Sequence, residues 1–129
     1  MSNILEFIDA LLPQDKINIH YLELPQDEMG MLIEETSING KIHSFAGYDG
    51  VISSLIQFYV RVEPKNNKYK EINALLKSFY KIVKNNKGLE VENIKLLHVG
   101  EFNLSPAMRD EKNNYVFSLM FPIIYKEME

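Results

Sequence analysis

The segment at residues 115–125 limits what this chain can fold into more than any other feature. Its odd positions put apolar side chains on one face of an extended strand, because successive side chains point to opposite faces. Its even positions are also mostly apolar, with Val116, Met120 and Ile124 among them. A strand hides one face against its own core, so a second apolar face needs a second cover. We expect that cover to be another helix of the same chain or another copy of the protein.

The bulk composition is that of a folded domain. A length of 129 residues suits a single domain, residues 1–129, with one core. No apolar run approaches the about 18 residues that a membrane helix needs, and the N-terminus has no signal-peptide pattern, so we expect no membrane partner. The chain has no cysteine. This excludes disulfides, zinc–thiolate sites and a thiol nucleophile, and it fits a reducing cytosol.

Charge is spread unevenly along the chain. The net charge is -4, yet residues 1–64 carry 10 acids and 3 bases, whereas residues 65–129 carry 8 acids and 11 bases. One interpretation is a solvated surface with a chance imbalance. The other is a molecule with an acidic and a basic side that meet head to tail in an oligomer. The acidic balance predicts no specific binding of nucleic acid.

Two helices are predicted. The first is short: Asn3 can cap it, Glu6 completes a capping box, and Pro13 ends it. The second follows Asn66-Asn67 and ends at Lys87-Gly88, with cations and glycine at its C-terminal end. Its apolar residues recur at helical spacing. They are Tyr69, Ile72, Leu75, Leu76, Phe79, Ile82 and Val83.

Strands are predicted on both sides of the long helix. In residues 51–63 apolar side chains recur at mostly every second position, as in a strand. Residues 91–104 also have the pattern of a strand, with a bulge or bend at Gly100. Asn39-Gly40 is the strongest turn signal in the chain, and it favours a hairpin between residues 31–38 and 41–45. Residues 47–50 form a second predicted turn.

The order of these elements predicts an α+β fold. We expect a mainly antiparallel four- to five-stranded sheet, with a long amphipathic helix and a short N-terminal helix packed on it. A right-handed crossover is an alternative for the strand–helix–strand unit at residues 51–99. It would make the two strands of this unit parallel.

No constellation of residues predicts catalysis, a metal site or a cofactor site. His20, His43 and His98 are far apart and occur in no metal-binding spacing. There is no nucleophile elbow and no phosphate-binding glycine loop. In each of the acid pairs at residues 27–28 and 34–35, the two side chains point to opposite faces of an extended chain. This favours a solvated edge over an acid/base couple. We therefore predict that the protein is not an enzyme.

Two polar regions have both a plain and a functional interpretation. Seven lysines lie between Lys65 and Lys87, and Lys77, Lys81 and Lys84 share one helix face. They form either the solvated back of the helix or a docking face for an acidic neighbour. The loop at residues 102–111 mixes apolar and charged residues. It is either a plain hairpin end or a functional loop.

The second half of the sequence resembles the minor capsid and tail-terminator proteins of tailed phages. The resemblance covers roughly residues 51–125. It rests on the strand motif at residues 56–61, on the helix that follows at once, and on Ser105-Pro106 before Arg109-Asp110-Glu111 and the terminal segment. In that family a strand of this kind precedes the main helix, and the chain ends in a strand with a final aromatic residue.

This resemblance implies a non-enzymatic subunit that assembles into a ring, often a hexamer, at the head-proximal end of a phage tail. Its partners would be copies of itself, tail-tube protein and head-connector protein. It would occupy the virion, and the host cytoplasm during assembly. We predict a protein interface at the hairpin end, the second turn and the even face of the terminal segment. Its residues are Tyr48, Asp49, Arg109, Asp110, Glu111, Met120 and Ile124.

A second hypothesis remains open. The chain can also be interpreted as a small bacterial regulatory or ligand-binding module with an α+β sheet. Such a domain would cover the second sheet face with its own helix and bind a small molecule in a cleft.

Overall fold

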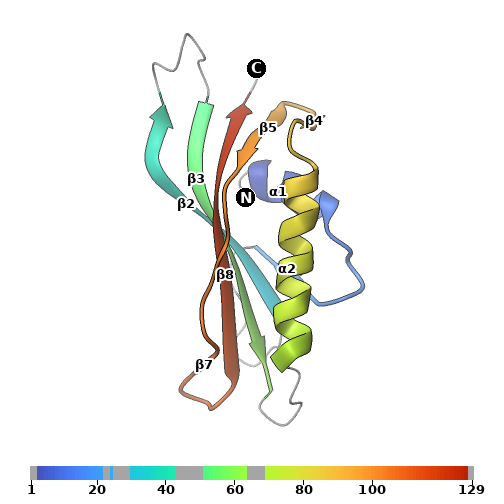
Figure 1. Ribbon diagram of the computed structural model, residues 1–129, viewed down its shortest axis with the longest axis vertical. Helices are drawn as coiled ribbons and strands as arrows, with labels where there is room; N and C mark the ends of the chain where they lie inside the picture. Colours follow the sequence, from blue (N-terminus) through green and yellow to red (C-terminus); the bar gives the residue numbers. More distant parts are fainter. Residues whose placement is uncertain (1–2, 22–23, 25–29, 43–50, 64–68, 128–129) are drawn as a thin grey trace.

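The computed structural model describes residues 3–21, 24, 30–42, 51–63 and 69–127. Two helices lie in this part of the chain, α1 (Asn3–Leu11) and α2 (Tyr69–Asn85). Both lie on the same side of the sheet (Figure 1). Beyond the end of α2, Gly88 adopts a φ of 92°, which residues other than glycine rarely adopt. Its N–H donates to the carbonyl of Leu96, so this turn is held against the strand that contains Leu96.

Three long strands form the middle of the sheet. They are β2 (Gly30–Ile42), β3 (Val51–Val62) and β8 (Tyr115–Glu127). The shorter strands are β1 (Ile19–His20), β4 (Glu90–Val91), β5 (Ile94–Val99), β6 (Asn103–Leu104) and β7 (Met108–Arg109). The sheet has the order β1-β2-β3-β8-β5-β4, and β6 and β7 also pair with β8. β1 runs parallel to β2, and the other pairs are antiparallel.

The sheet corrects the predicted fold class. We predicted a mainly antiparallel sheet of four to five strands, and this is wrong: the described residues form one mixed, curled sheet of eight strands, and strands dominate the fold (Figure 1). The physical reason is length. Four of the strands have only two residues each, too few to produce an alternating pattern. The unit at residues 51–99 also forms no direct strand pair, because β8 lies between β3 and β5.

The Asn39-Gly40 signal is also corrected. These residues lie inside β2, which continues to Ile42. The ladder with β3 shifts register between Ser37 and Lys41 and then resumes with Lys41 opposite Ile52. The long ladder on β3 therefore overrides a local turn preference, and the dipeptide marks an irregularity within the strand. The second predicted turn, with Tyr48 and Asp49, lies outside the described residues.

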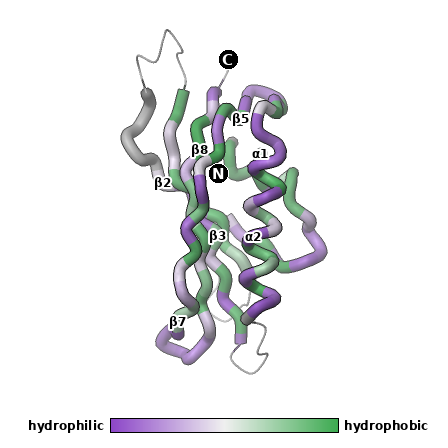
Figure 2. Tube along the Cα trace, viewed as in Figure 1, coloured by the Kyte–Doolittle hydropathy of each residue, from purple (hydrophilic) through white to green (hydrophobic). Residues whose placement is uncertain are grey.

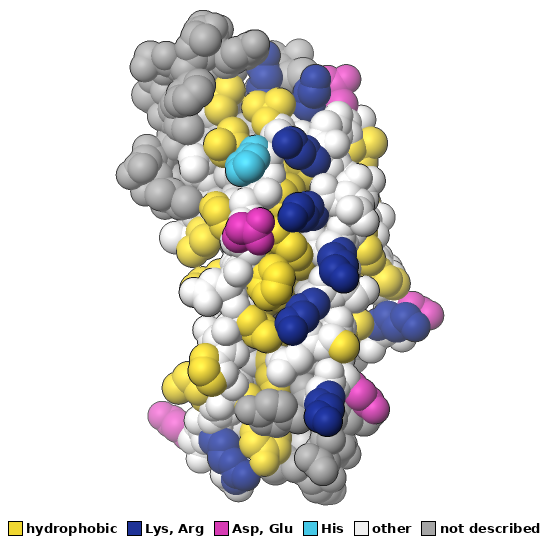
Figure 3. Space-filling view, in the orientation of Figure 1, with side chains coloured by type: hydrophobic (Ala, Val, Ile, Leu, Met, Phe, Trp, Pro, Cys, Tyr) yellow, Lys and Arg dark blue, Asp and Glu magenta, His cyan; other side chains and the backbone are white. Residues whose placement is uncertain are grey.

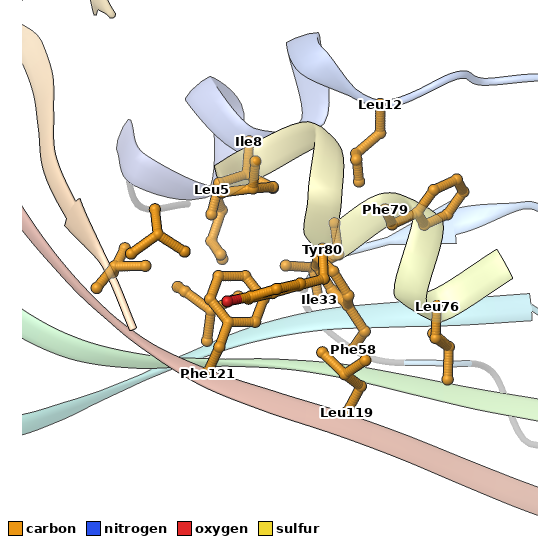
Figure 4. Close-up of a cluster of buried hydrophobic side chains, with 14 of the residues drawn as sticks. Leu5, Ile8, Leu12, Ile33, Phe58, Leu76, Phe79, Tyr80, Leu119 and Phe121 are labelled. Carbon is orange, nitrogen blue, oxygen red and sulfur yellow. The ribbon is translucent and has the colours of Figure 1, made fainter. Parts of the chain in front are cut away.

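The core fills the space between the helices and one face of the sheet (Figure 4). Phe58 of β3 and Phe121 of β8 meet there with ring centroids 5.4 Å apart, and Tyr80 of α2 lies 5.2 Å from Phe121. Buried and half-buried positions alternate along β3 and β8, and hydrophobic residues recur along α2 (Figure 2). Phe58, Phe79 and Phe121 are fully buried.

Candidate functional site

The three long strands carry a second apolar surface on the side away from the helices. We call it the outer face. Its side chains alternate with buried core residues along β3 and β8, and each is half-buried. None of its apolar members belongs to the core cluster. These members are Leu32, Leu55, Tyr59, Val116, Met120, Pro122 and Ile124.

Strand register joins these side chains into one continuous surface. Leu32 pairs with Tyr59 across β2 and β3, and Leu55 pairs with Pro122 across β3 and β8. Paired side chains on one face of an antiparallel ladder lie within contact distance. Polar members interrupt the surface, with Gln57 opposite both Glu34 and Met120. The outer face is therefore a mixed surface. Its seven apolar side chains alternate in space with polar and charged ones, which are Glu34, Thr36, Ser53, Gln57, Arg61, Ser118 and Lys126.

Its size matters for function. β3 has 12 residues, which extend about 40 Å, and three strands span about 14 Å across, so the outer face covers on the order of 600 Å². One partner in a stable complex contributes about 800 Å². Both described helices lie on the opposite side (Figure 1). Within the described ranges, no helix covers the outer face.

The β7–β8 hairpin extends this surface at one end. Met108 of β7 pairs with Val116 of β8 and is 65% exposed. Arg109 follows it, with its guanidinium carbon 4.8 Å from the ring centroid of Tyr115. The guanidinium also donates hydrogen bonds to Asn113 and to the Tyr115 hydroxyl. Arg109 and Glu111 are exposed, so the hairpin end presents both charges to solvent.

Asp110 organises the hairpin turn. Its Oδ1 accepts hydrogen bonds from the backbone N–H groups of Lys112, at 3.0 Å, and Asn114, at 2.8 Å. Its Oδ2 lies 3.4 Å from Nε of Arg61 on β3. Partial burial alone would raise the pKa of Asp110, but these hydrogen bonds and the Arg61 charge outweigh it, and the pKa is lowered. The carboxylate thus holds the turn against the end of β3.

We expect the Asp110→Asn variant to lose part of the acid sensitivity of the fold. A lowered carboxyl pKa stabilises the folded chain above the ordinary value of 3.8, and this contribution disappears as the pH falls through the folded pKa. Urea unfolding on both sides of pH 3.8 measures it. Wild type should lose stability with a steeper slope than the variant. The exposed neighbour provides the control, since Glu111→Gln should keep the wild-type slope; equal slopes in wild type and Asp110→Asn would contradict the assignment.

A polar cluster lies on the helix side of the sheet, across β2, β3 and β8. The hydroxyl of Tyr125 donates to Oε2 of Glu35 at 2.5 Å, and the hydroxyl of Ser54 donates to the same oxygen at 2.7 Å. Tyr125 and Ser54 are buried. Burial of the Tyr125 hydroxyl and its bond to Glu35 raise its pKa above the ordinary value. The cluster joins the three long strands, and its groups satisfy one another.

The predicted site residues fall into three groups. Met120 and Ile124 lie on the outer face, whereas Arg109, Asp110 and Glu111 lie together at the hairpin end. Tyr48 and Asp49 lie outside the described residues. Sequence reasoning did not include the outer-face residues of the neighbouring strands, such as Leu32, Leu55 and Tyr59. The alternation of residues 51–63 already put Leu55 and Tyr59 on one face, but only the register with β8 shows that they continue the same surface.

Among the described residues, other kinds of site leave little trace. In the described ranges, no group of three or more acidic, histidine or cysteine side chains could hold a metal ion. Neither described helix is long and apolar enough to span a membrane. A hollow of about 120 Å³ lies between α1 and the β4–β5 turn, and one of about 170 Å³ lies beside Arg61 and Asp110. Both are smaller than the about 300–1,000 Å³ of typical ligand pockets.

Two comparisons of the sequence with known proteins add no relative. No family model matches the chain, and no curated protein matches its sequence. The resemblance to tail-terminator proteins therefore remains a prediction from the residues quoted above.

Proposed function

We propose that this chain is a non-enzymatic assembly protein that works as an oligomer of its own copies. In this proposal the oligomer is a ring of the tail-terminator or minor-capsid kind at the head-proximal end of a phage tail. The single observation that supports it best is the outer face. Seven apolar side chains on three long strands face away from the core and from both described helices.

A partly apolar surface of this size favours association. Burial contributes roughly 25 cal/mol for each Å² of apolar surface removed from water. Isolated apolar side chains on a protein surface are ordinary, but a continuous band of them marks a site of contact with another chain. A sheet face also suits packing against a second layer at a spacing of about 10 Å. We therefore assign the outer face to contact with a second copy in the assembled ring.

A ring requires each subunit to present one surface to the next copy and a different surface to the previous one. The β7–β8 hairpin, with Arg109 and Glu111 exposed, provides a charged projection at one end of the molecule. We assign this end to the rim that meets tail-tube or head-connector protein. The protein would then act in the virion, and in the host cytoplasm during assembly.

The association of copies through the outer face can be tested directly. We expect the Met120→Lys/Ile124→Lys variant to raise the dissociation constant of the oligomer by at least about 100-fold, since two ammonium groups would be desolvated at the contact. Sedimentation velocity and native mass spectrometry over a range of concentrations measure this. Circular dichroism should show the variant still folded, because both residues are only half-buried.

The matched control adds the same charges elsewhere. Ser78→Lys/Asn18→Lys replaces two exposed residues away from the outer face and should assemble as wild type does. A wild-type chain that stays monomeric at the highest attainable concentration, alone and mixed with tail-tube protein, would contradict the proposal. The regulatory-module hypothesis would then gain support. Terminase, portal and tail genes beside the coding sequence would favour the proposal instead.

A further inference from the structure

A row of lysines follows the outward side of α2. Lys70, Lys77, Lys81 and Lys84 are all exposed. At about 100° of rotation per residue they fall within an arc of about 60° on the helix surface. The buried residues Ile72, Leu76, Phe79 and Val83 occupy the opposite side. We call these four residues the lysine row. It extends about 21 Å, and Figure 3 shows basic side chains aligned along this part of the surface.

Repulsion among the charges of the lysine row destabilises the helix. Lysines three, four and seven positions apart repel one another, whereas an ordinary solvated face mixes both signs. Lys70 also lies in the first turn, where the helix dipole disfavours a cation. In the described part of the chain, the row has one ion pair, between Lys84 and Glu101 at 4.0 Å. The Lys84 side chain is about half exposed and that of Glu101 is largely exposed, so this pair contributes little.

The same chain carries a surface of opposite charge. Glu6 of α1 and Glu92 of the β4–β5 turn both line the hollow of about 120 Å³. Val91, which is 43% exposed, and Ala10 also line it. A lysine side chain has a long apolar stem and a charged end. Apolar walls beside two carboxylates suit such a side chain. We call this surface the acidic hollow.

We propose that the lysine row of one copy docks on the acidic hollow of the next copy, head to tail. The inference rests on the proposed assembly function and names its charged contact. The two surfaces differ, so the contact is heterologous and repeats from copy to copy, as a ring requires. Glu6 lies in the acidic half of the chain and the lysine row in the basic half, whereas Glu92 is an acidic residue within the basic half.

A second copy fits the lysine row better than the other occupants do. The outer face cannot take the row, because four ammonium groups would lose their hydration against apolar side chains. A nucleic acid would meet a chain of net charge -4, which repels phosphates at long range. The acidic hollow provides two carboxylates for two of the four charged ends and apolar contact for their stems.

Charge reversal on each side, followed by mixing, tests the contact. We expect Lys77→Glu/Lys81→Glu and Glu6→Lys/Glu92→Lys each to weaken self-association at low salt by on the order of 100-fold. Mixed in equal amounts, the two variants should associate again. The acidic row of one variant then meets the basic hollow of the other, so the two altered surfaces have opposite charges. Sedimentation velocity measures both steps. Lys16→Glu/Lys87→Glu makes the same change of charge at two exposed lysines off the row and should behave as wild type.

The outcomes separate this inference from the proposed function. If wild type assembles and the Lys77→Glu/Lys81→Glu variant assembles equally well, the charged contact is wrong and the outer-face proposal stands. If both charge variants fail alone and also fail when mixed, the two surfaces do not meet, and the contact is again wrong. A wild type that never assembles overturns both. Should Glu6→Lys unfold α1, the neutral Glu6→Gln/Glu92→Gln variant must still weaken association.

Discussion

Replacing Phe121 by alanine should lower the free energy of unfolding by about 3–5 kcal/mol. Phe121 is fully buried, and its ring packs against Phe58 and Tyr80 at the point where β3, β8 and α2 meet (Figure 4). Truncation removes the transfer free energy of the ring and leaves a cavity that flanking strands cannot close, because β8 has ladder partners on both sides. Urea unfolding followed by circular dichroism measures the loss.

The control is the adjacent residue in the chain. Met120 points to the outer face and is half-buried, so we expect Met120→Ala to cost less than about 1 kcal/mol in a chain kept dilute enough to be monomeric. Its effect should appear in association instead, whereas folded Phe121→Ala should still associate. Equal losses of stability for the two variants would show that β8 is sealed on both sides within one chain. That result would remove the physical basis of the proposed assembly.

The alternation of β8 could be predicted because the strand is long. Over 13 residues the two-residue period is distinct, and the positions expected on one face, including Phe117, Leu119 and Phe121, are buried. The two-residue strands could not be predicted, since their pairing depends on where the chain returns in space. Met108–Arg109, for example, becomes a strand because the hairpin places it beside Val116 and Tyr115.

The Asn39-Gly40 error has a different cause. A turn dipeptide reports the preference of an isolated backbone, but β3 offers β2 a ladder on both sides of it, from Gly30 opposite Arg61 to Ile42 opposite Val51. Many ladder hydrogen bonds together outweigh one local preference. Similarly, the sequence placed Met120 and Ile124 on a second apolar face, but the neighbouring strands of that face became evident only from the register.

Gly100 should tolerate no side chain, and Gly100→Ala should cost about 1–3 kcal/mol. An added Cβ would lie 2.5 Å from Cγ of Pro122 and 3.2 Å from its Cδ, so the ring or the strand would have to move. A backbone hydrogen bond holds the two residues together, because the N–H of Gly100 donates to the carbonyl of Pro122 at 2.8 Å. Proline has no N–H to return this bond. The Gly100 carbonyl accepts the Tyr80 hydroxyl instead, at 2.6 Å.

A double-mutant cycle with Pro122→Ala tests this explanation. Removing the ring takes away the atoms that an added Cβ would meet, so Gly100→Ala should cost much less in the Pro122→Ala background, with a coupling free energy of about 1–2 kcal/mol. Equilibrium unfolding of the four proteins gives the coupling. Additive losses would mean that the alanine acts elsewhere, through the backbone of Gly100 or the unfolded chain. A measured coupling would also support an explanation for the proline inside β8. Pro122 lies where β5 has ended and β6 has not begun. It lies opposite Gly100, whose carbonyl accepts a hydrogen bond from Tyr80 of α2 and so needs no N–H from the proline.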